Sequence, residues 1–279
     1  MAGTKRPIIS KLMLICLLIA LLLAGGVFYL YKNRTKASTI QPPVSIQAVN
    51  NNENDKIIFS SVPILMYHYI RESNDPEDEA GVSLSVSPEK FDQQMAYLEA
   101  NNYQTISFSQ MIKGYRENSK ILKDKKPIII TFDDGYSDAY NNAYPILKKH
   151  NFIGVFYIIT GQIGRYERVT EEQIRELDSN GMITGGHTKS HFELDGLDSD
   201  LITSQLLDSK QMLESIVGHP IYDFCYPAGK YNDNVISILK SSGYHSAVTT
   251  KRGLSNNQSD LYQLPRIRVQ NSTNLENAF

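Results

Sequence analysis

The chain has 279 residues, of which 41% are hydrophobic and 21% are charged, a composition typical of globular proteins. The first 36 residues contain six basic and no acidic residues, so the remainder holds 22 basic and 30 acidic residues, a formal charge of −8. This charge argues against nucleic acid or anionic lipid as its main partner. Cys225 is the only cysteine outside the apolar N-terminal run, which excludes a disulfide within the rest of the chain.

Residues 12–31 form an uncharged apolar run that is long enough to cross a hydrocarbon core of about 30 Å. We expect residues 1–36 to be a cytoplasmic tail with an uncleaved transmembrane helix, because cleaved signal peptides have apolar regions of only about 7–15 residues. A cleaved signal peptide is the alternative. Residues 37–60 are polar with a Pro-Pro pair and are expected to be a flexible linker. Residues 61–279 then form the catalytic domain.

Short apolar runs alternate with helical patterns about seven times over residues 62–269. Residues 71–87, which follow the first predicted strand, are expected to be an acidic loop. Strands are predicted at 64–70, 126–132, 152–159, 182–186, 221–227 and 244–250, and helices at 87–102, 137–150, 170–181, 198–218 and 232–243. This alternation predicts an α/β fold with parallel strands, and its length favours a (β/α) barrel of about seven strands over an open doubly wound sheet. No phosphate-binding glycine motif is present, so no nucleotide is expected.

Candidate catalytic groups follow two of these predicted strands. Asp133 and Asp134 come directly after the strand at 126–132, and His187 and His191 follow the strand at 182–186 with a spacing of four. Active sites of such folds lie at the carboxyl ends of the strands. Two imidazoles and one carboxylate make a three-ligand metal site with a position left for water, and the second carboxylate can take a proton from that water. Either motif alone is more often a turn, a helix cap or a chance pair.

Three segments together resemble the polysaccharide deacetylase family, which is carbohydrate esterase family four with its NodB-like domain. They are "TFDDGY" at 131–136, "HTKSH" at 187–191 and the strand end "YPAG" at 226–229. The resemblance extends over about residues 60–270. It implies a distorted (β/α) barrel and hydrolysis of the N-acetyl amide on a sugar.

The resemblance also implies roles for individual residues. Asp133 matches the catalytic base, and Asp134, His187 and His191 match the ligands of a divalent metal, usually zinc and sometimes cobalt, nickel or manganese. The metal would polarise the acetyl carbonyl and its water. The backbone N–H of Ala228 would help to bind the oxyanion.

The chain departs from the third motif of the family, Arg-x-Pro-Tyr, because Cys225 stands where the arginine that orients the base is expected. Arg266 or Arg268, in "LPRIRV", is a candidate replacement from another strand. The competing interpretation makes both of them surface arginines on an edge strand.

A second departure concerns the catalytic acid. The usual Leu-x-His motif is absent after residue 229, where the only histidine is His245. His68 in the first strand is the candidate, because first and last strands are neighbours in a barrel. This order is similar to that of the circularly permuted deacetylases of exopolysaccharides and cell walls. The alternative for His68 is a core histidine. Tyr67, Tyr136 and Tyr226 are candidates for stacking on the sugar.

The sequence is therefore interpreted as a membrane-anchored, extracytoplasmic, metal-dependent N-deacetylase of a Gram-positive-type envelope, or a secreted one if the N-terminal segment is cleaved. Its expected substrate is N-acetylglucosamine in peptidoglycan or a wall glycopolymer. An O-acetyl esterase on the same class of polymer and a catalytically silent glycan-binding module are the alternatives.

Overall fold

The computed structural model describes residues 61–73, 77–117 and 125–279. The predicted membrane anchor at 1–36 and linker at 37–60 lie outside these described residues. Among the helices within the described ranges, none is both long and apolar enough to span a membrane.

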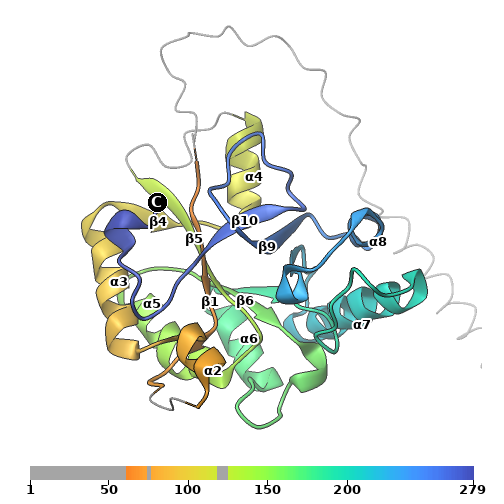
Figure 1. Cartoon of the computed structure of the whole chain (residues 1–279), viewed down its shortest axis with the longest axis horizontal. Coiled ribbons are helices and arrows are strands. Elements are labelled where there is room, and N and C mark those ends of the chain that lie inside the picture. Colours follow the sequence, from red (N-terminus) through yellow and green to blue (C-terminus); the bar gives the residue numbers. More distant parts are fainter. Residues whose placement is uncertain (1–60, 74–76, 118–124) are drawn as a thin grey trace, which may run out of the picture. The chain divides into compact units, whose positions relative to one another are not determined.

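A closed parallel barrel of seven strands forms the centre of the domain (Figure 1). The strands of the sheet follow the order β1-β10-β9-β8-β7-β6-β5-β4, and β1 also pairs with β5, which closes the ring. Their bounds are β1 Ile64–Tyr67, β4 Tyr103–Thr105, β5 Lys126–Phe132, β6 Val155–Ile158, β7 Ile183–Gly186, β8 Asp223–Cys225, β9 Ser246–Arg252 and β10 Leu264–Arg268. The prediction of an α/β barrel with about seven parallel strands is confirmed.

Strand β5 is long enough to pair with two strands along one of its edges. Residues 126–128 pair with β4, and residues 129–132 pair with β1. The predicted first strand, 64–70, is interrupted at His68, after which β2 (Tyr69–Ile70) leaves the barrel and pairs with β3 (Ser85–Val86). This interruption places the backbone of His68 at the carboxyl end of β1.

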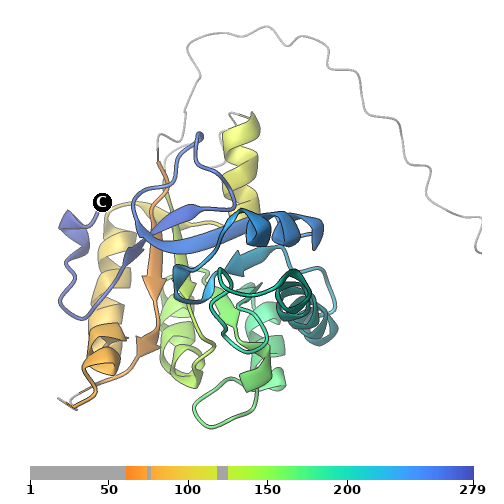
Figure 2. The same cartoon turned by 45° about the vertical axis from the view of Figure 1, so that its right-hand side comes forward.

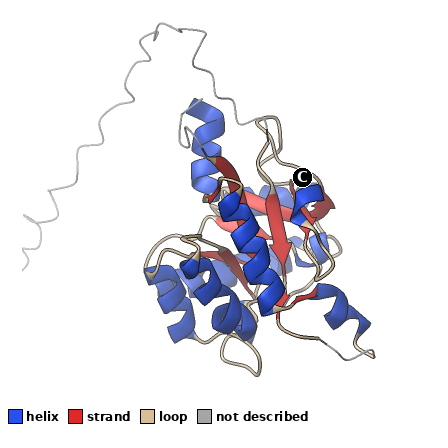
Figure 3. Ribbon diagram, turned by 90° about the vertical axis from the view of Figure 1, so that its left-hand side faces the viewer, coloured by secondary structure: helices blue, strands red, loops and turns tan. Residues whose placement is uncertain are grey.

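Helices cover the outside of the barrel, as Figures 2 and 3 show from two further directions. Their bounds are α2 Glu79–Leu84, α3 Pro88–Ala100, α4 Phe108–Glu117, α5 Tyr144–Lys149, α6 Glu171–Ser179, α7 Ser199–Val217 and α8 Asp233–Ser241. Local chemistry sets several ends: Thr170 and Gln173 form a capping box at the start of α6, and α7 ends at Gly218 with φ 80°. Helix α2 corrects the prediction that residues 71–87 are all loop, since the Asp78 side chain caps it by accepting from the Gly81 N–H.

Apolar side chains pack in two layers, because successive residues of a strand point to opposite faces. In β6, Phe156 and Ile158 pack outwards under the helices, whereas Val155 and Tyr157 belong to a separate inner cluster. Phe108 and Met111 of α4 join this inner cluster. Helix α4 therefore closes the amino end of the barrel and leaves the carboxyl end of the strands for polar groups.

Asp223, a buried carboxyl group at the start of β8, allows the effect of burial on a pKa to be tested. Burial raises its pKa to about 6, and its Oδ1 accepts a hydrogen bond of 2.7 Å from the Ser246 hydroxyl. The folded state therefore holds the proton more tightly than the unfolded chain does. As a result, the free energy of unfolding decreases as the pH rises from 3.8, the ordinary pKa of an aspartate, to about 6.

Asn at position 223 keeps an acceptor for Ser246 and carries no charge. We therefore expect the stability of Asp223→Asn relative to the wild type to increase by ~3 kcal/mol between about pH 4 and about pH 7. Urea unfolding of both proteins across this range measures the difference. A difference that stays constant with pH would contradict the burial of an ionisable carboxyl at this point.

Candidate active site

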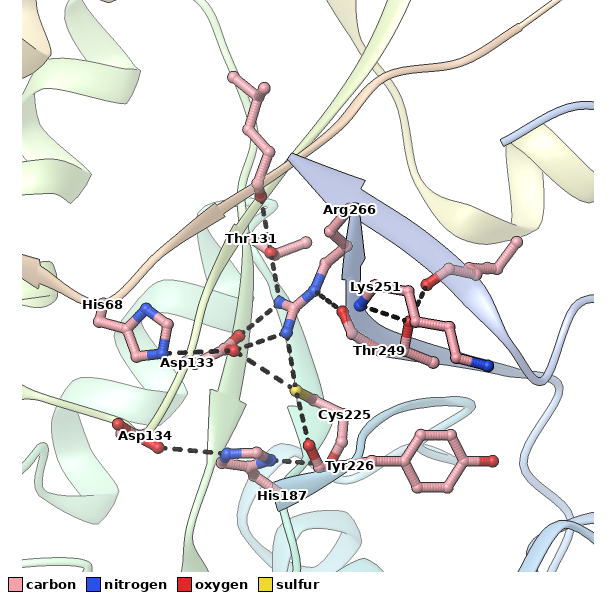
Figure 4. Close-up of polar contacts among 12 residues, drawn as sticks. His68, Thr131, Asp133, Asp134, His187, Cys225, Tyr226, Thr249, Lys251 and Arg266 are labelled. Carbon is pink, nitrogen blue, oxygen red and sulfur yellow. Dashed lines mark hydrogen bonds and ion pairs between the residues drawn. The ribbon is translucent and has the colours of Figure 1, made fainter. Parts of the chain in front are cut away.

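The polar side chains of the site come from the carboxyl ends of five strands, β1, β5, β7, β8 and β10. Figure 4 shows their polar contacts. Asp133 and Asp134 follow β5, and His187 follows β7. His68 follows β1, while Cys225 and Arg266 lie at or near the ends of β8 and β10 and complete the group. Parallel pairing brings these strand ends to one edge of the barrel, although the residues are up to about 200 positions apart in the chain.

Asp134, His187 and His191 converge on one point. The Asp134 Oδ1 atom lies 3.2 Å from His187 Nε2 and 3.3 Å from His191 Nε2, and the three potential ligand atoms lie within 4.8 Å of one another. Burial alone would raise the pKa of Asp134, but hydrogen bonds from the two imidazoles hold it well below its usual value. An ionised carboxylate oxygen with two ring nitrogens is a donor set that suits a divalent metal such as zinc.

Backbone geometry and one carbonyl fix the orientation of these groups. Asp134, Thr188 and His191 adopt positive φ angles of 72°, 63° and 60°, which are uncommon for residues other than glycine and each cost about 1 kcal/mol or more. His187 Nδ1 donates to the Cys225 carbonyl oxygen at 2.7 Å, because a carbonyl can only accept. His187 Nε2 is therefore the ring nitrogen that is directed to Asp134.

Asp133 is held by a buried arginine. Arg266, which is 0% exposed, donates from both terminal nitrogens to the two carboxylate oxygens of Asp133 at 2.7 Å each. Arg266 also donates to the Thr249 carbonyl at 2.9 Å and to the Thr131 hydroxyl at 2.9 Å. Burial alone would raise the pKa of Asp133, but the Arg266 guanidinium outweighs it and lowers that pKa. Asp133 is thus ionised and rigidly oriented, as a general base must be.

Of the two arginines that the sequence offered, the structure places only Arg266 beside Asp133, whereas the Arg268 side chain is exposed. Cys225 occupies the space next to this pair. Its Sγ atom lies 3.5 Å from Asp133 Oδ2 and 3.2 Å from an Arg266 nitrogen. The interpretation of both arginines as surface residues is wrong for Arg266.

His68 faces Asp133, with its Nε2 atom 3.8 Å from Asp133 Oδ2 and a side chain that is 13% exposed. Burial lowers the pKa of His68, and the nearby Asp133 and Asp134 only partly offset this. His68 is therefore no ordinary core histidine: its ring nitrogen lies close to the carboxylate of the candidate base and is partly open to solvent.

Ala228 lies in the turn after β8, has φ 51° and is exposed. Its N–H forms no backbone hydrogen bond within the described part of the chain, whereas the next two residues donate to Tyr226 and Pro227. The peptide group of Ala228 thus has an unused donor close in sequence to Cys225, whose carbonyl holds His187.

The predicted stacking on the sugar is wrong for Tyr67 and Tyr226, whereas it stays a prediction for Tyr136. Tyr67 and Tyr226 are 0% exposed, and their hydroxyls donate to the Gln94 side chain and the Tyr262 carbonyl. Tyr136 is half-buried, and the Tyr69 ring and the Arg168 guanidinium lie 3.8 and 3.9 Å from its ring centre. Tyr67 fails because it precedes His68, so alternation turns its side chain into the outer core.

Two further residues support the site. Arg168 donates to the Asp134 carbonyl oxygen at 2.8 Å, and Thr131 lies two positions before Asp133, on the same face of β5. Thr131 could have been found from this period of two in the sequence. No sequence pattern points to Arg168, because it lies in a loop that is far from Asp134 along the chain.

Replacing Arg266 by Gln should leave the buried Asp133 carboxylate without its cation. We expect Arg266→Gln to lower the free energy of unfolding at pH 7 by about 3–5 kcal/mol and to raise the pKa of Asp133. Urea unfolding measures the first effect, and NMR titration of the Asp133 carboxyl carbon the second. Arg268→Gln, in the same strand but exposed, is the control and should change both by little. Equal behaviour of the two variants would refute the assigned role of Arg266.

Comparison with known proteins agrees with this geometry. The family model described as polysaccharide deacetylase matches residues 120–247. YxkH of Bacillus subtilis (strain 168), named as a polysaccharide deacetylase, is 34% identical over 245 residues, which cover 84% of this chain and 82% of that protein. The poly-beta-1,6-N-acetyl-D-glucosamine N-deacetylase of Staphylococcus epidermidis is 28% identical over 254 residues, which cover 82% of this chain and 87% of that protein.

Among solved structures, the Streptococcus pyogenes deacetylase PplD in complex with acetate has a TM-score of 0.72 to this structure and 34% sequence identity. The match covers 78% of this chain and 96% of that one. Sequence and fold therefore agree over most of both chains. This chain belongs to the polysaccharide deacetylase family.

Proposed function

We propose that this protein hydrolyses the N-acetyl groups of N-acetylglucosamine residues in a cell-envelope polysaccharide, peptidoglycan or a wall glycopolymer, with the help of a divalent metal. The observation that carries the proposal is the ionised Asp133, fixed by Arg266, beside a group of one carboxylate and two imidazoles. The substrates named for the related staphylococcal enzyme and the acetate in the related streptococcal structure support the same bond.

Asp134, His187 and His191 would hold the metal, and zinc suits this donor set best. When bound, such an ion acts as a Lewis acid on the acetyl carbonyl and makes water a better nucleophile. The low pKa of Asp134 keeps its carboxylate ready to bind the cation. Hydrogen bonding to Cys225 turns His187 Nε2 towards the same point.

Asp133 accepts the proton of the water that attacks the acetyl carbon. The low pKa of Asp133 keeps it unprotonated at neutral pH, and Arg266 leaves its carboxylate no freedom to rotate. His68 donates a proton to the sugar nitrogen as the carbon–nitrogen bond breaks. Burial lowers the pKa of His68, so the resting imidazole is neutral and needs a proton during turnover. Asp133 Oδ2, 3.8 Å away, is the nearest acid once it has taken the proton of water.

The catalytically silent alternative depended on the missing arginine at Cys225. Arg266 occupies the position beside Asp133 that this arginine was expected to fill. The absence of an arginine at position 225 therefore no longer argues for a catalytically silent protein. An O-acetyl esterase would use the same groups. It differs in its need for an acid, because an alkoxide leaves far more readily than an amide anion.

We also propose that the catalytic domain acts outside the cytoplasm and is tethered to the membrane by the apolar run at 12–31. Support comes from the length of that run and from the polar linker of residues 37–60. A tethered domain reaches the wall layers next to the membrane, which is why an envelope polymer is proposed in place of a free polysaccharide.

Acetate release tests the reaction. The full chain should release acetate from N-acetylglucosamine oligomers, poly-β-1,6-N-acetylglucosamine or purified peptidoglycan, and a chelator should abolish the release until zinc is restored. Asp133→Asn should lower the rate by about 10³-fold, within the range of general base catalysis. Asp208→Asn, at an exposed carboxylate that pairs with Lys189, is the control and should retain full activity. Chelator-resistant release would rule out the metal-dependent mechanism.

His68→Ala tests the acid and separates amide from ester chemistry. The variant should lose about 10²–10³-fold in rate on an N-acetylated oligomer and less than about tenfold on an O-acetylated one, because only the amide needs a protonated leaving group. His219→Ala, which removes a surface imidazole paired with Asp178, is the matched control. Equal losses on both substrates would show that His68 does not protonate the leaving nitrogen.

A further inference from the structure

A second cavity lies at the amino end of the barrel, away from the candidate active site. It has a volume of about 590 Å³, within the range of roughly 300–1,000 Å³ that is usual for small-molecule sites. It is lined by α4, by the first residues of β7 and β8, and by segments that lead into β9 and β10. The catalytic groups follow the carboxyl ends of the same parallel strands, so the two sites are at opposite ends of the barrel.

A buried carboxylate lines this cavity. Asp223 is only 8% exposed, and Ser246 satisfies its Oδ1 atom at 2.7 Å. The Oδ2 atom accepts no hydrogen bond from any described residue. The neighbouring Lys210, which acts on Asp223 only through its charge, donates to the Ile221 carbonyl instead. Because Asp223 lines the cavity, a ligand that brings a donor to this oxygen can form a hydrogen bond with a carboxylate there.

Aromatic rings form one wall. Tyr222 and His245 stack with ring centres 4.3 Å apart and planes 10° apart, and Tyr222 is 42% exposed. The His245 ring nitrogens have no hydrogen-bond partner in the described part of the chain. Tyr262 lines the cavity as well, and its hydroxyl is fixed by donation to the Tyr244 carbonyl at 2.9 Å. Such a wall favours a ligand with a flat apolar face and polar edges.

Two cations of α4 stand at the rim of the cavity. Lys113 and Arg116 are spaced i, i+3 on the helix and are both exposed. Arg116 forms no ion pair with a carboxylate among the described residues. An arginine in this position is suited to bind a carboxylate or a phosphate group.

We propose that this cavity binds a saccharide that carries an acidic substituent, a carboxylate or a phosphate. The sugar hydroxyls donate to Asp223 Oδ2, the ring packs on the Tyr222–His245 wall, and the acidic group faces Arg116. A free inorganic anion would use only the rim and would be repelled by Asp223. A neutral sugar would form no ion pair with Arg116. Since the cavity is remote from the catalytic groups, this binding is separate from the proposed reaction.

Calorimetric titration of the chelator-treated full chain tests the proposal without turnover. The probes are N-acetylmuramic acid for the carboxylate, glucose 6-phosphate for the phosphate and N-acetylglucosamine as the neutral sugar. Arg116→Gln should weaken binding of one or both acidic probes by about fivefold and leave the neutral sugar unchanged. Tyr222→Ala should weaken all bound probes by a similar factor. Whichever acidic probe responds to Arg116→Gln identifies the substituent.

Arg175→Gln, at an exposed arginine paired with Glu171 on α6, is the matched control and should bind as the wild type does. Melting temperatures within a few degrees of the wild type establish that the variants are folded. Acidic probes that bind equally well to Arg116→Gln and Tyr222→Ala, or that do not bind the wild type at millimolar concentration, overturn the proposal. Acetate release from a short neutral oligomer should be unchanged in Arg116→Gln, which separates this site from the proposed reaction.

Discussion

The bidentate ion pair between Arg266 and Asp133 depends on closure of the barrel. Arg266 belongs to the last strand and Asp133 follows β5, and they meet because β1 pairs with β10 on one side and with β5 on the other. Each partner would be costly alone at 0% and 3% exposure, whereas the pair with its bonds to Thr131 and Thr249 satisfies both. A single interaction thus joins the ring of strands, orients the Asp133 carboxylate and keeps it ionised.

Cys225 connects this pair to the group formed by Asp134, His187 and His191. Its sulfur contacts Asp133 and Arg266, and its carbonyl oxygen accepts from His187. A small side chain is required here, because the Arg266 guanidinium already fills the space beside Asp133. Arg266 thus occupies the place beside Asp133 where the family motif predicts an arginine at position 225.

The sequence predicted the barrel and most of the site because both rest on regular patterns. Alternation of apolar runs with helical periods identifies the parallel strands, and polar residues at their ends identify Asp133, Asp134 and His187. Sequence could not choose between Arg266 and Arg268, since residues two apart in a strand point to the same face. Only the position along β10 separates the buried Arg266 from the exposed Arg268 at the end of the strand. Tyr67 and Tyr226 were misplaced because aromatic content does not show which rings are buried.

Helix α4 was not predicted, although its signal is present. Phe108, Met111, Ile112 and Tyr115 follow the spacing i, i+3, i+4 and i+7 of an amphipathic helix. Gly114 in its middle and the short strand β4 before it obscure that pattern. The consequence of this helix is structural, because its apolar face closes the barrel, while its cations Lys113 and Arg116 face the amino-end cavity.

Two buried aspartates near opposite ends of the barrel show how pairing sets the chemistry of a carboxyl group. Asp133 and Asp223 are almost equally inaccessible, at 3% and 8% exposure. Arg266 lowers the pKa of the first, whereas the second has a hydrogen bond from Ser246 and only the charge of Lys210 nearby, so burial raises its pKa to about 6. The paired group is a preorganised acceptor for a proton at neutral pH. The other is an incompletely satisfied acceptor, whose missing partner must come from outside the protein.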